Sequence, residues 1–203
     1  MFIQIFDCQM LEEVPYTGMD LERSISSQPT GINEGYCFYQ SDKTIEVTFP
    51  VPSGCVLQEI SSSFDASKKS ICYGLNGKPP AICGILWDNA SIKTSILYTD
   101  VYKIVFNKHD EKTWPLFISS PSSQGIDPKS EFMLGVFEDA QNSYSKALQY
   151  YQHSASQGFL HAKLLLADNY LSSYNNYNLP HDPSNTTNLY LEVIIYHLQM
   201  LTN

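Results

Sequence analysis

Asn76 and Gly77 lie between two short apolar segments, and this arrangement constrains the fold more than any other feature of the chain. The stretch reads Tyr73-Gly-Leu-Asn-Gly-Lys-Pro-Pro-Ala-Ile-Cys-Gly-Ile-Leu-Trp87, and a second tryptophan follows within Thr113-Trp-Pro-Leu-Phe117. An Asn-Gly pair between apolar residues is the strongest short-range signal for a β-hairpin. The sequence therefore predicts two antiparallel strands joined around Asn76-Gly77, with Trp114 closing the core.

The chain on both sides of this hairpin has the period-two pattern of half-buried strands. Segment 45–51 alternates apolar side chains with Glu46, Thr48 and Pro50, and its prolines place it at a sheet edge or at the end of a strand. Turn-forming residues separate the successive segments. We expect seven antiparallel strands packed as a β-sandwich, at residues 36–40, 45–51, 59–64, 70–75, 81–87, 91–98 and 101–107.

The C-terminal part of the chain has helical periodicity instead. A Ser/Pro/Gly-rich linker is expected at residues 119–129, and the apolar spacing from Met133 to Tyr151 predicts one long amphipathic helix. A second helix is expected at 159–171, and Asp182-Pro183 predicts the capped start of a third that ends near residue 201. The fold class is therefore α+β: a seven-stranded antiparallel β-sandwich followed by a short all-α tail.

The hairpin and the later tryptophan also carry a family resemblance. Gly74-Leu-Asn-Gly-Lys-Pro79 and Trp114 resemble the Gly-Leu-x-Gly-x-Pro hairpin and the late Trp of CS domains of the NudC type. The resemblance covers residues 36–118 and implies the CS sandwich topology. It leaves residues 1–35 as an acidic N-terminal arm, in which Phe2 to Phe6 is expected to pair as a strand, and residues 130–203 as the helical tail.

The tail itself resembles a Sel-one-like repeat, a relative of the tetratricopeptide repeat. The matching positions are Ala147, Tyr150, Tyr151, Ala155, Gly158, Ala162 and Tyr170. Asp182 and the helix after it look like the start of a second unit, which is displaced by an expanded loop.

Composition excludes several classes of function. The formal net charge is −9, and the first 35 residues carry six acids against Arg23 alone, so nucleic acid is not an expected partner. No apolar stretch approaches the roughly 18 residues that span a bilayer, so no membrane association is expected. The five cysteines are odd in number and form no Cys-x-x-Cys pair, which favours a reduced cytoplasmic or nuclear location.

The sequence does not favour an enzyme. The five histidines are scattered at 109, 153, 161, 181 and 197, where surface or packing roles are expected, and Gly74 to Lys78 lacks the spacing of a phosphate loop. No nucleophile with a base, no metal-ligand set and no cofactor site can be assembled. We therefore expect no catalytic residues, no cofactor and no metal.

The expected function is binding. Resemblance to the NudC-like family implies a non-enzymatic co-chaperone or scaffold that binds heat-shock protein 90 and client proteins such as β-propeller proteins. The alternative is an adaptor, with CS and helical-repeat modules, in signalling, ubiquitin ligation or dynein-linked trafficking. Candidate protein-binding residues are Lys68, Lys69, Lys78, Trp87 and Trp114, with the lysines as a positive patch. For the tryptophans, core packing is the favoured interpretation and ligand binding the other.

The last helix carries more apolar positions than one packing stripe can bury. We therefore expect a homodimer through the C-terminal helices, with Leu191, Ile194, Ile195 and Leu198 at the interface. Docking of these residues back on the sandwich is the alternative, which the polar linker disfavours.

Overall fold

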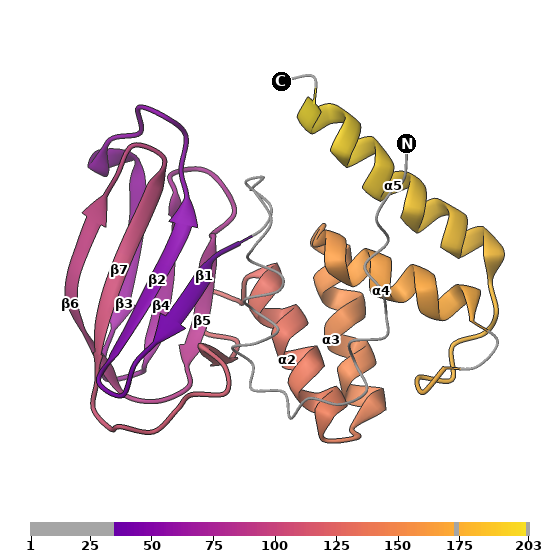
Figure 1. The fold of residues 1–203 in the computed structure, drawn as a ribbon, viewed down its shortest axis with the longest axis horizontal. Coiled ribbons are helices and arrows are strands. Elements are labelled where there is room, and N and C mark those ends of the chain that lie inside the picture. The colour runs from indigo at the N-terminus through magenta and orange to yellow at the C-terminus, as the bar shows by residue number, and fades with distance from the viewer. Residues whose placement is uncertain (1–34, 173–174, 202–203) are drawn as a thin grey trace.

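The computed structural model describes residues 35–172 and 175–201, which form an α+β structure with two antiparallel sheets and four α-helices. In Figure 1 the sheets lie on one side and the helices on the other, with α2 next to the sheets and α5 farthest from them. The expected N-terminal arm, including the strand at Phe2 to Phe6, lies outside the described residues except for Gly35.

The first sheet, sheet A, contains four strands in the order β1-β2-β7-β6. Their bounds are Cys37–Gln40 (β1), Thr44–Pro50 (β2), Val101–Lys108 (β7) and Ala90–Leu97 (β6). Val47 in β2 lies opposite Phe38 on one side and Ile104 on the other, so β2 is an inner strand and Pro50 marks its end.

The second sheet, sheet B, has the order β3-β4-β5-β8. Its strands are Ile60–Asp65 (β3), Ser70–Leu75 (β4), Ile82–Leu86 (β5) and Ile118–Ser120 (β8), and a short 3-10 helix, η3, covers Leu57–Glu59. All seven expected segments form strands. The described residues contain eight strands and not the expected seven, because β8 has only three residues and is too short to show a period.

The sandwich core is built from alternate side chains of both sheets. Phe117, which precedes β8, is buried in this core and contacts the rings of Tyr36, Phe38, Phe106 and Trp114. The strand residues at its centre are Ile45, Val47, Phe49, Ile71, Tyr73, Ile82, Leu86, Ile104 and Phe106.

The glycines of the Gly-Leu-x-Gly-x-Pro motif have two different structural roles. A Cβ atom on Gly74 would lie 2.9 Å from the Pro80 Cα atom, so the backbones approach too closely for a side chain. Gly77 has a φ of 72°, in a turn closed by a 3.0 Å hydrogen bond from the Lys78 N–H to the Leu75 carbonyl. Because β4–β5 pairing stops at Tyr73 and Ile82, the connection is longer than a two-residue hairpin turn.

Four helices follow the sandwich: α2 (Pro128–Ala140), α3 (Tyr144–Ser156), α4 (Leu160–Leu171) and α5 (Pro183–Leu201). Each packs against the next in chain order, as Figure 1 shows. The expected long helix from Met133 to Tyr151 is wrong, because two helices occupy this range. Asn142 has a φ of 60°, and the Ser143 N–H donates to the Glu138 carbonyl at 2.9 Å, which ends α2 in a Schellman-type cap.

The expected second and third helices correspond to α4 and α5. The Asp182 carboxylate accepts hydrogen bonds from the backbone N–H groups of Ser184 (3.1 Å) and Asn185 (3.0 Å), as expected for the residue that caps α5.

The segment 119–129 differs from the expected linker. It begins within β8 and ends within α2, and Asp127 and Lys129 are each only 1% exposed. Asp127 and Lys129, which belong to this polar segment, form hydrogen bonds in a buried junction between the sandwich and the helices.

Candidate protein-binding surfaces

The three candidate lysines do not form one patch. Lys68 and Lys69 precede β4, whereas Lys78 follows its other end. A six-residue strand is roughly 17 Å long, so the two groups lie at opposite ends of sheet B. Lys68 also lies 3.6 Å from Asp65, which offsets its charge locally. The expected positive patch is therefore corrected to two separate sites, with Lys68 and Lys78 exposed and Lys69 partly buried.

Trp114 is a core residue and not a surface platform. Its side chain is 1% exposed and stacks on Phe117 with a ring-centroid distance of 6.4 Å. The indole Nε1 has no hydrogen-bond partner among the described residues. The favoured interpretation of Trp114 as a core residue is confirmed, and its candidacy as an exposed binding residue is corrected.

Trp87 lies where the sandwich and the helices meet. It is partly buried and packs against both hydrophobic cores, with its ring edge-to-face on Phe137 of α2 at 5.6 Å. Its backbone N–H donates to the Phe117 carbonyl at 3.0 Å. Trp87 therefore joins the two parts of the molecule.

Asp127 anchors the start of α2 to sheet B. Its carboxylate accepts from the Cys83 N–H at 3.0 Å, and from the Ser130 N–H at 2.9 Å and hydroxyl at 2.6 Å. Burial raises the pKa of Asp127 to about 6, against the opposing effect of the Ser130 and Cys83 hydrogen bonds and the Lys129 charge. The carboxyl thus serves as helix cap and as link to β5 at once.

Two further contacts tie α2 to the start of β1. The Lys129 ammonium donates to the Tyr36 carbonyl and lies 5.3 Å from the centre of the Tyr36 ring. The Tyr36 hydroxyl lies 3.0 Å from the Ser130 hydroxyl. These buried contacts hold the helices against the sandwich.

A second polar cluster ties α2 to α3. The Glu131 side chain, which is 6% exposed, hydrogen-bonds to the His153 imidazole and to the Gln157 amide. Burial raises the pKa of Glu131, while the His153 and Gln157 contacts oppose this rise. No local sequence pattern indicates this cluster, because Glu131 lies 22 residues before His153 and 26 residues before Gln157. It joins two helices and has no nucleophile bonded to it among the described residues.

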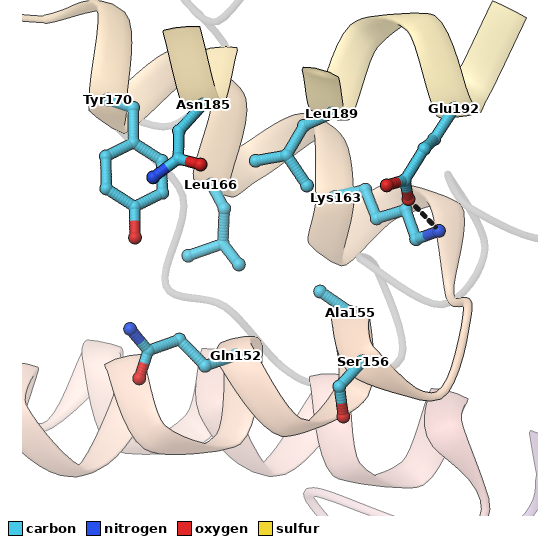
Figure 2. A pocket seen from close by; sticks show the side chains of 9 residues that line it. All are labelled: Gln152, Ala155, Ser156, Lys163, Leu166, Tyr170, Asn185, Leu189 and Glu192. Carbon is cyan, nitrogen blue, oxygen red and sulfur yellow. Dashed lines mark hydrogen bonds and ion pairs between the residues drawn. The ribbon is translucent and has the colours of Figure 1, made fainter. Parts of the chain in front are cut away.

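An open groove of about 390 Å³ lies between α3 on one side and α4 and α5 on the other, as Figure 2 shows. On the α4 and α5 side, an ion pair of 2.5 Å joins Lys163 of α4 to Glu192 of α5. The lining combines apolar, amide and charged side chains: Gln152, Ala155, Ser156, Lys163, Leu166, Tyr170, Asn185, Leu189 and Glu192. No histidine or cysteine is among these nine, and the Ser156 hydroxyl donates to the His153 carbonyl at 2.7 Å.

The four residues expected at a dimer interface form one exposed stripe on α5. Leu191, Ile194, Ile195 and Leu198 are each exposed by 49% to 56%. Their spacing of three, four and seven residues places them on one side of the helix. Thr186 and Val193, which are buried, lie on the side that packs against α4. The structure therefore brings these four residues together.

The outer face of sheet A is an exposed surface that the sequence analysis did not single out. Tyr39 on β1 and Ile96 on β6 are 47% and 41% exposed, and Tyr98 beyond the end of β6 is 51% exposed. A 2.5 Å ion pair joins Lys103 on β7 to Glu46 on β2 between them. The strand register places these residues on one face, because Tyr39 lies opposite Glu46 and Ile96 lies opposite Lys103.

In the described ranges, no group of three or more His, Cys, Asp or Glu residues is arranged to hold a metal ion. The helices of the same ranges include none with the length and apolarity needed to cross a membrane.

Comparison with known proteins finds similarity among solved structures. No family model matches the chain, and no curated protein matches it. Among solved structures, the chain is similar to the nuclear movement protein from E. cuniculi GB-M1. The identity is 20% and the TM-score 0.36, and the similarity covers 42% of this chain and 99% of that chain.

Proposed function

We propose that this chain is a NudC-like co-chaperone or scaffold that acts by binding heat-shock protein 90 and client proteins, such as β-propeller proteins, without turnover of a substrate. The proposal rests on one observation: the residues that resemble the NudC-type motif have structural roles in the sandwich. Gly74 permits a close backbone approach, Gly77 adopts a positive φ, and Trp114 fills the core. The location proposed with this function is the cytoplasm or nucleus.

The outer face of sheet A is the proposed binding face for the chaperone. Helix α2 packs against β5 and β8 of sheet B, and it also contacts Tyr36, the residue before β1. Tyr39 and Ile96 remain about half exposed on sheet A, next to the ion pair of Glu46 and Lys103. Aromatic residues such as tyrosine are enriched at protein interfaces and are frequent among the residues that contribute most to binding.

The proposal is tested with the full-length chain and purified heat-shock protein 90 by titration calorimetry. The double variant Tyr39→Ala/Ile96→Ala is expected to weaken binding at least tenfold, because truncating two interface anchors removes more than about 1.4 kcal/mol. The matched control is Lys68→Ala/Lys78→Ala, which changes exposed residues at the two ends of sheet B and is expected to bind as wild type does. Absence of saturable binding by the wild-type protein contradicts the proposal.

The groove between α3, α4 and α5 favours the second candidate function, an adaptor in signalling, ubiquitin ligation or dynein-linked trafficking. An adaptor needs a second binding surface, separate from the outer face of sheet A. The groove is such a surface, because residues of α3, α4 and α5 line it. Gln152→Ala/Asn185→Ala removes two amides from its lining. If affinity capture with this variant loses partners that the Tyr39→Ala/Ile96→Ala variant retains, the adaptor function is favoured.

The α5 stripe is proposed to pair with the same stripe of a second copy. The stripe has no charged member, and its residues repeat at intervals of three and four, as in the seam of two packed helices. The opposite side of α5 is already held by α4, so the stripe is presented by a fixed helix. A two-fold axis would bring identical apolar faces together.

A further inference from the structure

Two cysteines lie directly opposite each other in the hairpin formed by β4 and β5. Cys72 pairs with Cys83 in the strand register, so both side chains lie on the same face of sheet B. Both are free thiols; Cys72 is partly exposed and Cys83 is fully buried. The core residues Ile71, Tyr73 and Ile82 alternate with them, which places the two cysteines on the face away from the sandwich core.

The backbone of Cys83 shows which kind of ladder position this is. Its N–H donates to the Asp127 carboxylate at 3.0 Å, and its carbonyl accepts from the Asp127 N–H at 3.1 Å. Both polar groups of Cys83 therefore point away from β4. In an antiparallel ladder, this makes Cys72 and Cys83 a pair without mutual backbone hydrogen bonds.

A second hydrogen bond leads to the same assignment. The Leu86 N–H donates to the Lys69 carbonyl at 2.8 Å, which makes Lys69 and Leu86 a hydrogen-bonded pair. Pairs alternate along the ladder. Counting three positions along both strands from Lys69 and Leu86 reaches Cys72 and Cys83, which must then be a pair of the other type.

This type of pair suits a disulfide bond. Residues opposite each other without mutual backbone hydrogen bonds have Cα atoms roughly 4.5 Å apart. Disulfides accept Cα separations of about 4.4 to 6.8 Å. The two strands are therefore already close enough for a disulfide to form between them.

We propose that Cys72 and Cys83 are a redox-modification site, at which a low-molecular-weight disulfide such as oxidised glutathione converts the two thiols into a cross-strand disulfide. Cys72 reacts first because it is the exposed member of the pair. Its thiolate attacks one sulfur of the oxidant, forms a mixed disulfide and releases one thiolate. Cys83 loses its proton, attacks the Cys72 sulfur and releases the second thiolate. Two cysteine thiols are oxidised and one oxidant disulfide is reduced to two thiols.

The environment of Cys72 sets the expected rate. Burial and the neighbouring Cys83 thiol raise the pKa of Cys72, so little of it is thiolate at neutral pH. Since the thiolate is the nucleophile, exchange is slow there. The site therefore responds to sustained oxidation and not to brief exposure.

The disulfide would fix the hairpin that carries Gly74 and Gly77, because the turn lies between the two cysteines. It would also fix the strand to which Asp127 is bonded. Oxidation would therefore stiffen one end of the junction between the sandwich and α2. This inference does not depend on the proposed chaperone function.

The full-length protein is incubated with oxidised glutathione at about pH 8.5, where more of the thiol is ionised, and peptides are mapped without reduction. We expect a loss of two hydrogen atoms in the intact mass and a peptide that links Cys72 to Cys83. The thermal midpoint is expected to rise by roughly 5 to 10 °C. Cys83→Ser should instead stop at a glutathione adduct on Cys72. Cys37→Ser, at a partly exposed cysteine on sheet A, is the control and should form the linked peptide as wild type does.

Two results overturn the proposal. One is a stable glutathione adduct on Cys72 in the wild-type protein, which would show that Cys83 does not reach the Cys72 sulfur. The other is a lack of any linked peptide in the folded protein although both cysteines react fully after denaturation. The second measurement does not require any variant to fold.

Discussion

Gln40 holds the backbone of Trp114 by both of its polar groups, although 74 residues separate them. The Gln40 side-chain amide donates to the Trp114 carbonyl at 2.7 Å, and its oxygen accepts from the Trp114 N–H at 2.9 Å. Trp114 lies between strands β7 and β8, where no ladder satisfies its backbone. The glutamine thus supplies the hydrogen bonds that a neighbouring strand would otherwise provide.

Trp114→Ala is expected to lower the free energy of unfolding by about 3 to 5 kcal/mol, because it removes a fully buried aromatic side chain. Trp114→Phe should cost less, since it retains a ring and removes an Nε1–H group that has no partner among the described residues. Urea denaturation measures both. If Trp114→Ala unfolds at the wild-type midpoint, Trp114 does not close the core.

Gln40→Ala is expected to cost about 1 to 3 kcal/mol, because it leaves the Trp114 N–H and carbonyl unpaired. Gln40→Glu keeps an acceptor for the Trp114 N–H and should lose less than the alanine variant. Equal stability of both variants and wild type in urea would indicate that water replaces the amide.

The two motif glycines should respond differently to substitution. Gly74→Ala meets the Pro80 backbone at 2.9 Å and is expected to destabilise the protein by about 1 to 3 kcal/mol. A Cβ atom on Gly77 meets nothing within 4 Å, so Gly77→Ala costs only the strain of its positive φ, about 1 kcal/mol. Gly77→Asn, which tolerates this conformation better, is the control. Thermal denaturation ranks the three, and a smaller loss for Gly74→Ala than for Gly77→Asn would contradict the assignment.

The buried carboxyl of Asp127 predicts a pH dependence of stability. Its pKa is raised from 3.8 to about 6 in the folded state, so the folded protein binds this proton more tightly than the unfolded chain does. The stability contributed by protonation is fully present below about pH 4 and is lost as pH rises through about 6. The loss is on the order of 3 kcal/mol.

Asp127→Asn isolates this effect, because asparagine also caps helices but does not titrate. The stability of wild type relative to the variant should fall between about pH 4 and 7, as measured by urea denaturation at several pH values. Parallel curves for the two proteins would show that Asp127 titrates alike in the folded and unfolded states.

Ile194→Glu is expected to convert a homodimer into a monomer, because it places a charge at the centre of the α5 stripe. Circular dichroism should remain that of wild type, since Ile194 is 49% exposed in the single chain. Ile194→Val, which keeps an apolar side chain at the same position, is the matched control and should not dissociate the dimer. Sedimentation equilibrium of the full chain measures the oligomeric state of wild type and variants. A wild-type monomer at high micromolar concentration would exclude the dimer.

The period-two pattern predicted the strands well because one side of each sheet is buried. In β2, buried Ile45, Val47 and Phe49 alternate with partly exposed neighbours, and this alternation is visible in the sequence. Strand β8 has three residues and forms by pairing with β5, more than 30 residues earlier, so no local pattern reveals it. The break at Asn142 was missed because the apolar spacing continues across it.

The candidate binding residues were harder to predict than the strands. Residue type identified Lys68, Lys78 and Trp114 as candidates, but whether they lie together and are exposed depends on the tertiary structure. Leu191, Ile194, Ile195 and Leu198 lie together because they belong to one helix, where spacing fixes their relative position. Their role at a dimer interface stays a prediction. The clusters around Asp127 and Glu131 join separate elements, and their pairing depends on tertiary structure.

The placement of β8 has a consequence for truncated forms of this protein. The segment that leads to the helices supplies the last strand of sheet B, and Asp127 just beyond it satisfies the backbone of Cys83 in β5. A protein cut before Ile118 would therefore leave the N–H and carbonyl groups along one side of β5 unpaired. Such an open edge is a template for strands of other molecules, so the isolated sandwich would tend to aggregate through β5.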